Sequence, residues 1–168
     1  MESIYRSWDE AAAVTLRRMM DTAASSPRDQ KLFDPIENYL SQWIMRLQQG
    51  DFHESDIDLA VDILFRAGVT SLQELVDGYD FHSSDMVALL VRKQHDYGHD
   101  NINNFGIIGI AIRMCDKIAR IRNLTGRSSD GLNEPLHDSY LDVVGYAVIA
   151  SMYHDGSFQL QLERDKHE

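Results

Sequence analysis

The chain has 168 residues, of which 43% are hydrophobic and 26% are charged, and its formal net charge is −11. This length suits one ordinary domain, and the strongly acidic balance argues against general binding to DNA, RNA or anionic membranes. No run of 18 apolar residues is present, and the N-terminal residues lack the basic and then apolar order of a signal peptide. The single cysteine, Cys115, rules out an internal disulfide, so we expect a cytoplasmic protein.

Helix start and stop signals divide the sequence into about seven helical segments. The clearest start is a capping box, Ser7-Trp-Asp-Glu10, in which two side chains satisfy free N–H groups of the first turn. Gly68 predicts a helix end, and Ser71 predicts a new start shortly after it. The expected helices span about residues 7–24, 34–50, 55–68, 71–78, 83–97, 103–126 and 133–156.

This pattern predicts an all-α fold, a helical bundle without βαβ units or internal repeats. We expect the last three helical segments to form the bundle, with the earlier four packed around it. Residues 1–80 would then be an N-terminal helical extension, residues 81–156 the core, and residues 157–168 a polar tail. Weak apolar alternation in the tail fits a short strand or disorder. Gly145, inside the last helix, indicates close approach by a neighbouring helix or a ligand.

Three acids recur at every fourth position near the start of the last helix: Glu134, Asp138 and Asp142. That spacing brings neighbouring carboxylates close to one helix face, where like charges repel. The preceding helix adds Asp116 and should lie antiparallel to the last one. Carboxylates that face each other across two helices form an oxygen cage suited to Mg²⁺ or Mn²⁺. We therefore predict all four acids as metal ligands, with Glu134 and Asp138 as the catalytic residues.

The cationic residues of the same region are the predicted phosphate ligands. Residues 92–127 contain seven basic and three acidic residues, a balance of +4, so the remainder of the chain carries −15. A solvated surface also explains such a charge run. Structural explanations exist for the single acids too, since Asp116 and Arg120 form a favourable i,i+4 pair and Asp142 could pair with a basic residue such as Arg113 or Lys117. The predicted phosphate-binding residues are Lys93, Arg113, Lys117 and Arg120, which would neutralise phosphate oxygens that the metal does not reach.

A second cluster of polar side chains lies where one helix ends and the next begins. Residues 93–104, KQHDYGHDNINN, are dense in hydrogen-bonding groups, although Asn and Asp are common in turns for local reasons. We interpret this stretch as a base or sugar pocket near a helix N-terminus. The predicted nucleoside-binding residues are Asp96, Tyr97, Asn101 and Asn104.

Four motifs, taken in order, resemble those of a known family. They are KQHDYG, NFG, R-x-x-DK-x-x-R-x-x-NL and E-x-x-x-D-x-x-x-D-x-x-GYA. Over about residues 84–153 the chain resembles the phage and bacterial nucleotide-modification-associated helical domain, which is similar to the MazG-type all-α nucleoside triphosphate pyrophosphatases. Those enzymes carry E-x-x-E and E-x-x-D pairs on adjacent helices, which bind Mg²⁺ and the triphosphate. Here the first pair is Arg113-x-x-Asp116 and the second is widened to Glu134 and Asp138, so one acid is missing.

The resemblance implies a pyrophosphatase-like core, a nucleotide substrate and a homo-oligomer, a dimer or tetramer. For a phage-encoded chain the setting would be the bacterial host cytoplasm. The leading hypothesis is a Mg²⁺-dependent pyrophosphohydrolase that cleaves a (deoxy)nucleoside triphosphate to monophosphate and pyrophosphate, in nucleotide-pool or base-modification metabolism. Direct nucleic-acid binding and membrane association are not expected.

Three alternatives stay open at this point. Because one acid is missing, the chain fits a non-catalytic nucleotide-binding partner of a base-modifying enzyme. An HD-type metal phosphohydrolase would need several His-Asp pairs to converge, and a helical interaction protein would need no chemistry at all. The pairs in question are His95-Asp96, His99-Asp100, His137-Asp138 and His154-Asp155.

Overall fold

The computed structural model describes residues 3–28, 33–51, 53–126 and 133–167, and every regular element within these ranges is helical. The all-α prediction is therefore confirmed. The helices are α1 (Trp8–Ser25), α2 (Phe33–Gln48), α3 (Glu54–Gly78), α4 (Ser83–Tyr97), α5 (Asp100–Asn103), α6 (Gly106–Thr125), α7 (Asn133–Asp155) and the 3-10 turns η1 (Ser157–Gln159) and η2 (Glu163–His167). None of the described helices is long and apolar enough to cross a membrane.

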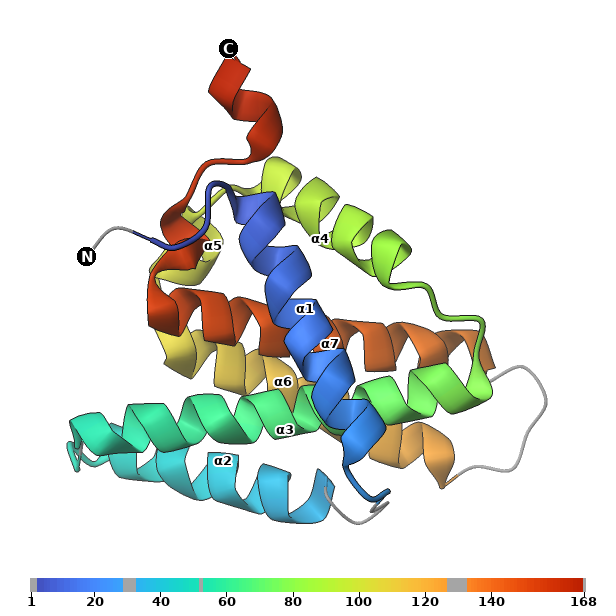
Figure 1. Ribbon diagram of the computed structural model, residues 1–168. Helices are drawn as coiled ribbons and strands as arrows, with labels where there is room; N and C mark the ends of the chain where they lie inside the picture. Colours follow the sequence, from blue (N-terminus) through green and yellow to red (C-terminus); the bar gives the residue numbers. More distant parts are fainter. Residues whose placement is uncertain (1–2, 29–32, 52, 127–132, 168) are drawn as a thin grey trace.

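Helix α7 lies at the centre of the molecule. It packs mainly against α3 and α6, while α1 crosses in front of α3 and α7 (Figure 1). Val143, Val144, Ala147 and Val148 of α7 are fully buried, because the flanking helices cover it on several sides. Helix α4 packs mainly against α1 and touches α7 only briefly. The expectation that residues 83–97 would join the two last helices as the bundle is thus wrong, since α3 takes that place. The division of the chain near residue 80 stays a prediction.

Helix α3 is one continuous helix of 25 residues, which corrects the two shorter helices predicted on either side of Gly68. Gly68 has a packing role here. A Cβ atom at this position would lie 2.6 Å from the Cβ of Ala147 and 2.6 Å from the sulfur of Met19. The missing side chain therefore lets α1 and α7 approach the α3 backbone. A glycine selected for close packing has the same sequence signature as one that ends a helix.

Helix α1 begins as the sequence predicts. Ser7 accepts a hydrogen bond from the backbone N–H of Glu10 at 3.1 Å, and the Glu10 carboxylate accepts from the N–H of Arg6. The Glu10 carboxylate thus accepts from the N–H of the residue before the cap, whereas in the usual capping box it accepts from the N–H of the cap residue itself.

The C-terminal tail is neither a strand nor disordered over the described residues. It forms the two 3-10 turns η1 and η2. Phe158 is fully buried with its ring against that of Trp8, and the backbone N–H of Trp8 donates to the carbonyl of Gln161 at 2.9 Å. The start and the end of the chain are therefore joined by both packing and a hydrogen bond.

Candidate functional site

Asp142, the acid inside the apolar part of α7, is paired with two lysines. Its Oδ2 lies 2.8 Å from Nζ of Lys117 on α6, and its Oδ1 lies 3.4 Å from Nζ of Lys93 on α4. The Asp142 side chain is 24% exposed, so the pair is partly shielded from water. An unpaired carboxylate at this depth would lose hydration without compensation, and the two ammonium groups supply that compensation.

The remaining predicted metal ligands do not gather around Asp142. Asp116, Glu134 and Asp138 are exposed. In the part of the chain that the structure describes, no group of three or more His, Cys, Asp or Glu side chains is placed to hold a metal ion. Each step of four residues turns about 40° around a helix, so three acids at that spacing spread over roughly 80° of the helix circumference. These described residues therefore do not fit a Mg²⁺ cage.

Next to the Asp142 pair lies a cavity of about 320 Å³, enclosed by α1, α4, α5, α6 and α7. We call it the basic cavity. Two cationic side chains, two tyrosines and one asparagine supply most of its polar lining, and apolar residues such as Leu90 and Ile149 complete it. These residues are Lys93, Tyr97, Asn101, Arg113 and Tyr146, and Gln94 is a further polar residue of the lining.

Local geometry positions these side chains. Gly98 ends α4 with φ of +68°, a conformation that favours glycine, and the chain then reverses into the single turn of α5. This reversal brings Tyr97 and Asn101 to the same cavity. Arg113 reaches from α6 and donates to the Asn101 carbonyl at 3.3 Å, which ties α5 to α6. The Oδ1 atom of Asn101 is buried with no hydrogen-bond partner among the described residues.

Tyr146 is the lining residue that the sequence did not single out. It stands one helical turn after Asp142 and therefore shares a face with it. Burial raises the pKa of the Tyr146 hydroxyl, and the nearby Asp142 carboxylate raises it further, against the opposing effect of Arg113 and Lys117. Tyr146 thus stays a neutral hydrogen-bond donor at physiological pH. The four-residue spacing from Asp142 was the sequence signal that could have identified Tyr146. Trp8 of α1 also lines the cavity, and no local sequence pattern points to it.

The structure brings together some of the predicted site residues and leaves others apart. Lys93, Arg113, Tyr97 and Asn101 line the basic cavity, and Lys117 lies beside it through Asp142. Asp96, Asn104 and Arg120 are exposed and do not line this cavity. The close approach predicted for Gly145 is confirmed, since a Cβ there would lie 3.3 Å from Leu90 of α4.

The His-Asp pairs have separate surroundings. Nε2 of His154 on α7 lies 3.0 Å from Oδ1 of Asp58, and Nε2 of His99 lies 3.1 Å from the Leu160 carbonyl oxygen. His95 is exposed. His137 packs against the Tyr79 ring, with ring centroids 4.9 Å apart. The pairs do not meet at one site among the described residues, which gives the HD-type hypothesis no support there.

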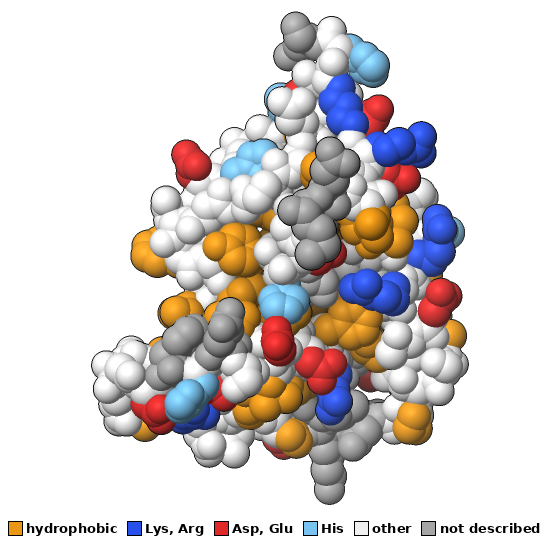
Figure 2. Space-filling model, turned by 60° about the vertical axis from the view of Figure 1, so that its left-hand side comes forward, with side chains coloured by type: hydrophobic (Ala, Val, Ile, Leu, Met, Phe, Trp, Pro, Cys, Tyr) orange, Lys and Arg blue, Asp and Glu red, His pale blue; other side chains and the backbone are white. Residues whose placement is uncertain are grey.

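The outer surface mixes charges of both signs. Figure 2 shows acidic and basic side chains lying close to one another on one face, with hydrophobic side chains between them. Exposed ion pairs of the described surface include Arg46 with Asp51 and Arg66 with Asp62. The face in view therefore lacks the broad basic area that a nucleic-acid duplex requires.

Fold and site together define an all-α domain with a cavity walled by basic and aromatic side chains. Residues 93–153 match the family model described as nucleotide modification associated domain 1. The matched segment contains α5, α6 and nearly all of α7, together with Lys93 and Tyr97 of α4. Searches among curated proteins and among solved structures gave no match. The likeness to MazG-type enzymes stays a prediction from the sequence motifs.

Proposed function

We propose that the basic cavity binds a nucleotide and that the chain is a nucleotide-binding domain. The observation that carries this proposal is the convergence of Lys93 and Lys117 on Asp142, beside the cationic part of the cavity that Lys93 and Arg113 line. The phosphate groups would lie at this cationic end, and the base and sugar would lie among Tyr97, Tyr146 and Asn101.

The local charge balance supports an anionic ligand. Lys93 and Lys117 face the single carboxylate of Asp142, and Arg113 lines the same cavity, which leaves a local excess of positive charge in a chain whose net charge is −11. A phosphate carries more negative charge than a carboxylate and offers more acceptor oxygens. It can therefore compete with Asp142 for Lys93 and Lys117. The match to a nucleotide-modification-associated family supports the same ligand class.

Binding without hydrolysis is the activity that these contacts support best, because Asp142 is engaged by lysines and the other acids are dispersed. The Mg²⁺-dependent pyrophosphohydrolase is the second candidate. It rests on the sequence motifs, because the description of the matching family names an association with nucleotide modification and neither hydrolysis nor a metal. Under the first proposal the chain would act as the nucleotide-binding partner of a base-modifying enzyme.

Calorimetric titration of the four dNTPs, the matching monophosphates and the nucleosides, all in EDTA, tests the binding proposal. Affinity should fall from triphosphate to monophosphate to nucleoside. Lys117→Gln should weaken triphosphate binding by about tenfold or more, because a charge-assisted hydrogen bond contributes roughly 1.5–3 kcal/mol. Arg92→Gln is the matched control, since Arg92 is an exposed cation of α4 that does not line the cavity.

Two results would count against nucleotide binding at this cavity: equal affinity for nucleoside and triphosphate, or unchanged binding in Lys117→Gln. The second candidate has its own assay. Each dNTP is incubated with Mg²⁺ or Mn²⁺, and the products are resolved as monophosphate plus pyrophosphate. Turnover that disappears in Glu134→Gln would favour the enzyme, whereas tight binding without turnover would favour the binding domain.

A further inference from the structure

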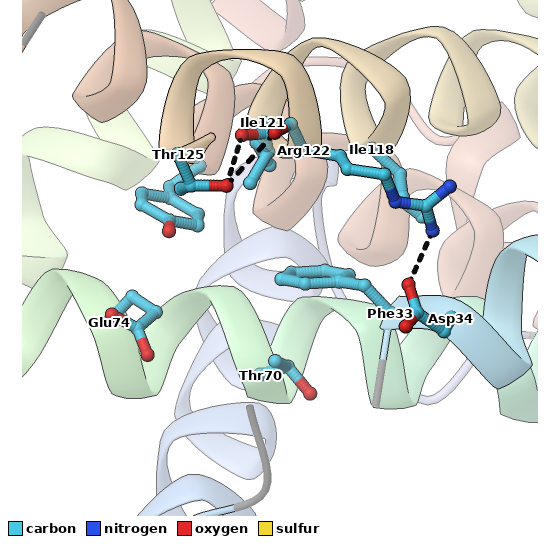
Figure 3. A pocket seen from close by; sticks show the side chains of 9 residues that line it. Phe33, Asp34, Thr70, Glu74, Ile118, Ile121, Arg122 and Thr125 are labelled. Atoms are coloured by element: carbon cyan, nitrogen blue, oxygen red, sulfur yellow. Dashed lines mark hydrogen bonds and ion pairs between the residues drawn. The ribbon is translucent and has the colours of Figure 1, made fainter. Parts of the chain in front are cut away.

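A second cavity, of about 330 Å³, lies between α2, α3, α6 and α7, and it shares no lining residue with the basic cavity (Figure 3). We call it the Glu74 cavity. Two turns of α6 contribute Ile118 and Ile121, which are almost fully buried and form an apolar wall. The side chain of Phe33 extends between α3 and α6 into the space in Figure 3. A planar apolar ring could therefore be held between Phe33 and the two isoleucines.

Two polar groups in this cavity have complementary hydrogen-bonding character. Tyr140 is 5% exposed, and burial followed by the charge of Glu74 raises its pKa to about 12. The Tyr140 hydroxyl is thus a neutral O–H donor. Glu74 is a charged acceptor, held by Arg28 through an ion pair of 2.6 Å to one oxygen. A carboxylate offers about four lone-pair sites, so this pair leaves acceptor capacity on Glu74.

The other hydroxyls are already used by the helices. Thr125 donates to the carbonyls of Ile121 and Arg122, as Figure 3 shows, and Thr70 donates to the carbonyl of Arg66. Among the lining hydroxyls, the proton left for a ligand is therefore that of Tyr140, and Glu74 supplies a carboxylate acceptor.

The mouth of the cavity disfavours anions. Arg122 is the cationic residue of the lining, and its guanidinium forms ion pairs with Asp34 at 2.6 Å and with Glu37 at 2.5 Å. Counting Glu74 and Asp34 against Arg122, the lining has an excess of negative charge. A phosphate group would meet this excess, which is the reverse of the balance at the basic cavity. The ligand that suits the Glu74 cavity therefore carries no negative charge.

We propose that the Glu74 cavity binds a neutral nucleobase or nucleoside through a lactam edge, an adjacent C=O and N–H. The ligand carbonyl would accept from the Tyr140 hydroxyl, its N–H would donate to Glu74, and its ring would lie against Phe33. Thymine, uracil and guanine carry such an edge. The cavity volume falls within the usual range of small-molecule sites, about 300–1,000 Å³. This site is independent of the nucleotide site proposed above.

Calorimetric titration of the whole chain with thymidine tests the site. Thymidine should bind saturably, and Tyr140→Phe should weaken it about three- to tenfold, the effect of losing one hydrogen bond. Tyr79→Phe is the matched control, because the Tyr79 ring packs 6.4 Å from that of Tyr140 without lining the cavity. N3-methylthymidine keeps the ring and both carbonyls but lacks the N–H. Its affinity for the wild type should therefore be no higher than the affinity of thymidine for Tyr140→Phe.

A further variant separates the two cavities. Tyr97→Ala alters the basic cavity, and thymidine binding should survive it. The proposal is overturned if thymidine does not bind at millimolar concentration, if N3-methylthymidine binds equally well, or if binding is lost in Tyr97→Ala and kept in Tyr140→Phe. Because N3-methylthymidine is used with the wild-type chain, the test stands even if a variant fails to fold.

Discussion

Lys117 and Asp142 face each other across α6 and α7, with Nζ 2.8 Å from Oδ2, and Lys93 of α4 approaches the other carboxylate oxygen at 3.4 Å. One carboxylate thereby connects three helices. The same contact explains how an acid can stand among the apolar residues of α7, because its charge is balanced across the helix interface rather than along its own helix.

Replacing Asp142 by asparagine should destabilise the metal-free protein and strengthen its binding of triphosphates. Lys93 and Lys117 would face each other without a counter-ion, and we expect a cost of about 1 kcal/mol, between the values for exposed and buried pairs. For a chain of this size that corresponds to a fall in melting temperature of about 2–4 °C. Calorimetric affinity for a dNTP should rise several-fold, because the competing carboxylate charge is gone.

Asp138→Asn is the control for that experiment, since the Asp138 side chain is 62% exposed and lies one turn earlier on α7. Its melting temperature should stay close to that of the wild type. A higher apo melting temperature in Asp142→Asn would instead indicate that Asp142 is repelled by other acids and would favour the metal-cage hypothesis.

Two helical glycines should respond differently to alanine. At Gly68 the added Cβ meets the Ala147 Cβ at 2.6 Å, and that atom cannot rotate away. We expect Gly68→Ala to cost about 1–3 kcal/mol through overpacking, despite the better helix propensity of alanine. At Gly145 the nearest atom is the end of the Leu90 side chain, at 3.3 Å, so Gly145→Ala should change stability by less than about 1 kcal/mol. Denaturant unfolding of both variants measures the contrast, and similar losses would contradict the packing role of Gly68.

Alkaline pH should destabilise the fold partly through Tyr140. An unfolded tyrosine ionises near its ordinary pKa of 10, whereas burial raises the pKa of Tyr140 in the folded chain to about 12. Between these values the folded state holds more protons, so the free energy of unfolding falls as pH rises from 10 to 12. The loss should reach up to roughly 2–3 kcal/mol. Tyr140→Phe should show a shallower decline between pH 10 and 12, and a slope identical to wild type would contradict this role. Tyr97→Phe, with an exposed ring, is the control.

Cys115 should react slowly with a thiol reagent at neutral pH. Burial, followed by the charges of Glu37 and Asp116, raises the pKa of its thiol to about 11. The reactive thiolate is therefore scarce below pH 9. The rate of labelling by a disulfide reagent should be at least tenfold lower than that of free cysteine at pH 7.5, and should approach it after unfolding in urea. Rapid labelling of the folded chain would contradict the buried setting.

Cap residues and helix-ending glycines in the sequence predicted those helix ends that depend only on neighbouring residues. The Ser7 cap is seen as expected, and α4 ends where Gly98 takes a positive φ. The helix end predicted at Gly68 was wrong. A glycine is needed there because α1 and α7 pack closely against it, and the sequence next to Gly68 does not reveal those two helices. The central place of α3 could not be predicted for the same reason. Helix periodicity gives the buried face of a helix, but it does not identify the partner of that face.

For the site, the sequence located the residues that turn geometry brings together, Tyr97 and Asn101, and the cations that lie near them. It did not foresee the contact between Lys93 and Asp142, which are 49 residues apart. Repulsion among the acids suggested a metal as the missing partner, with a basic residue such as Lys117 as the structural alternative. The structure places Lys117, together with Lys93 of α4, against Asp142. Spacing along one helix indicates which groups share a face, and the chemistry opposite that face depends on tertiary packing.

The segment that matches the family model cannot be expected to fold in isolation. Residues 93–153 omit α3, which covers the fully buried Val144 and its neighbours on α7, and they omit Trp8, which closes one wall of the basic cavity. A polypeptide cut at those limits would expose the apolar surface of α7 to water and would aggregate or stay unfolded. Changes that arise in α1 or α3 during evolution can therefore alter the shape of the basic cavity or the packing of α7 without touching any residue of the matched segment.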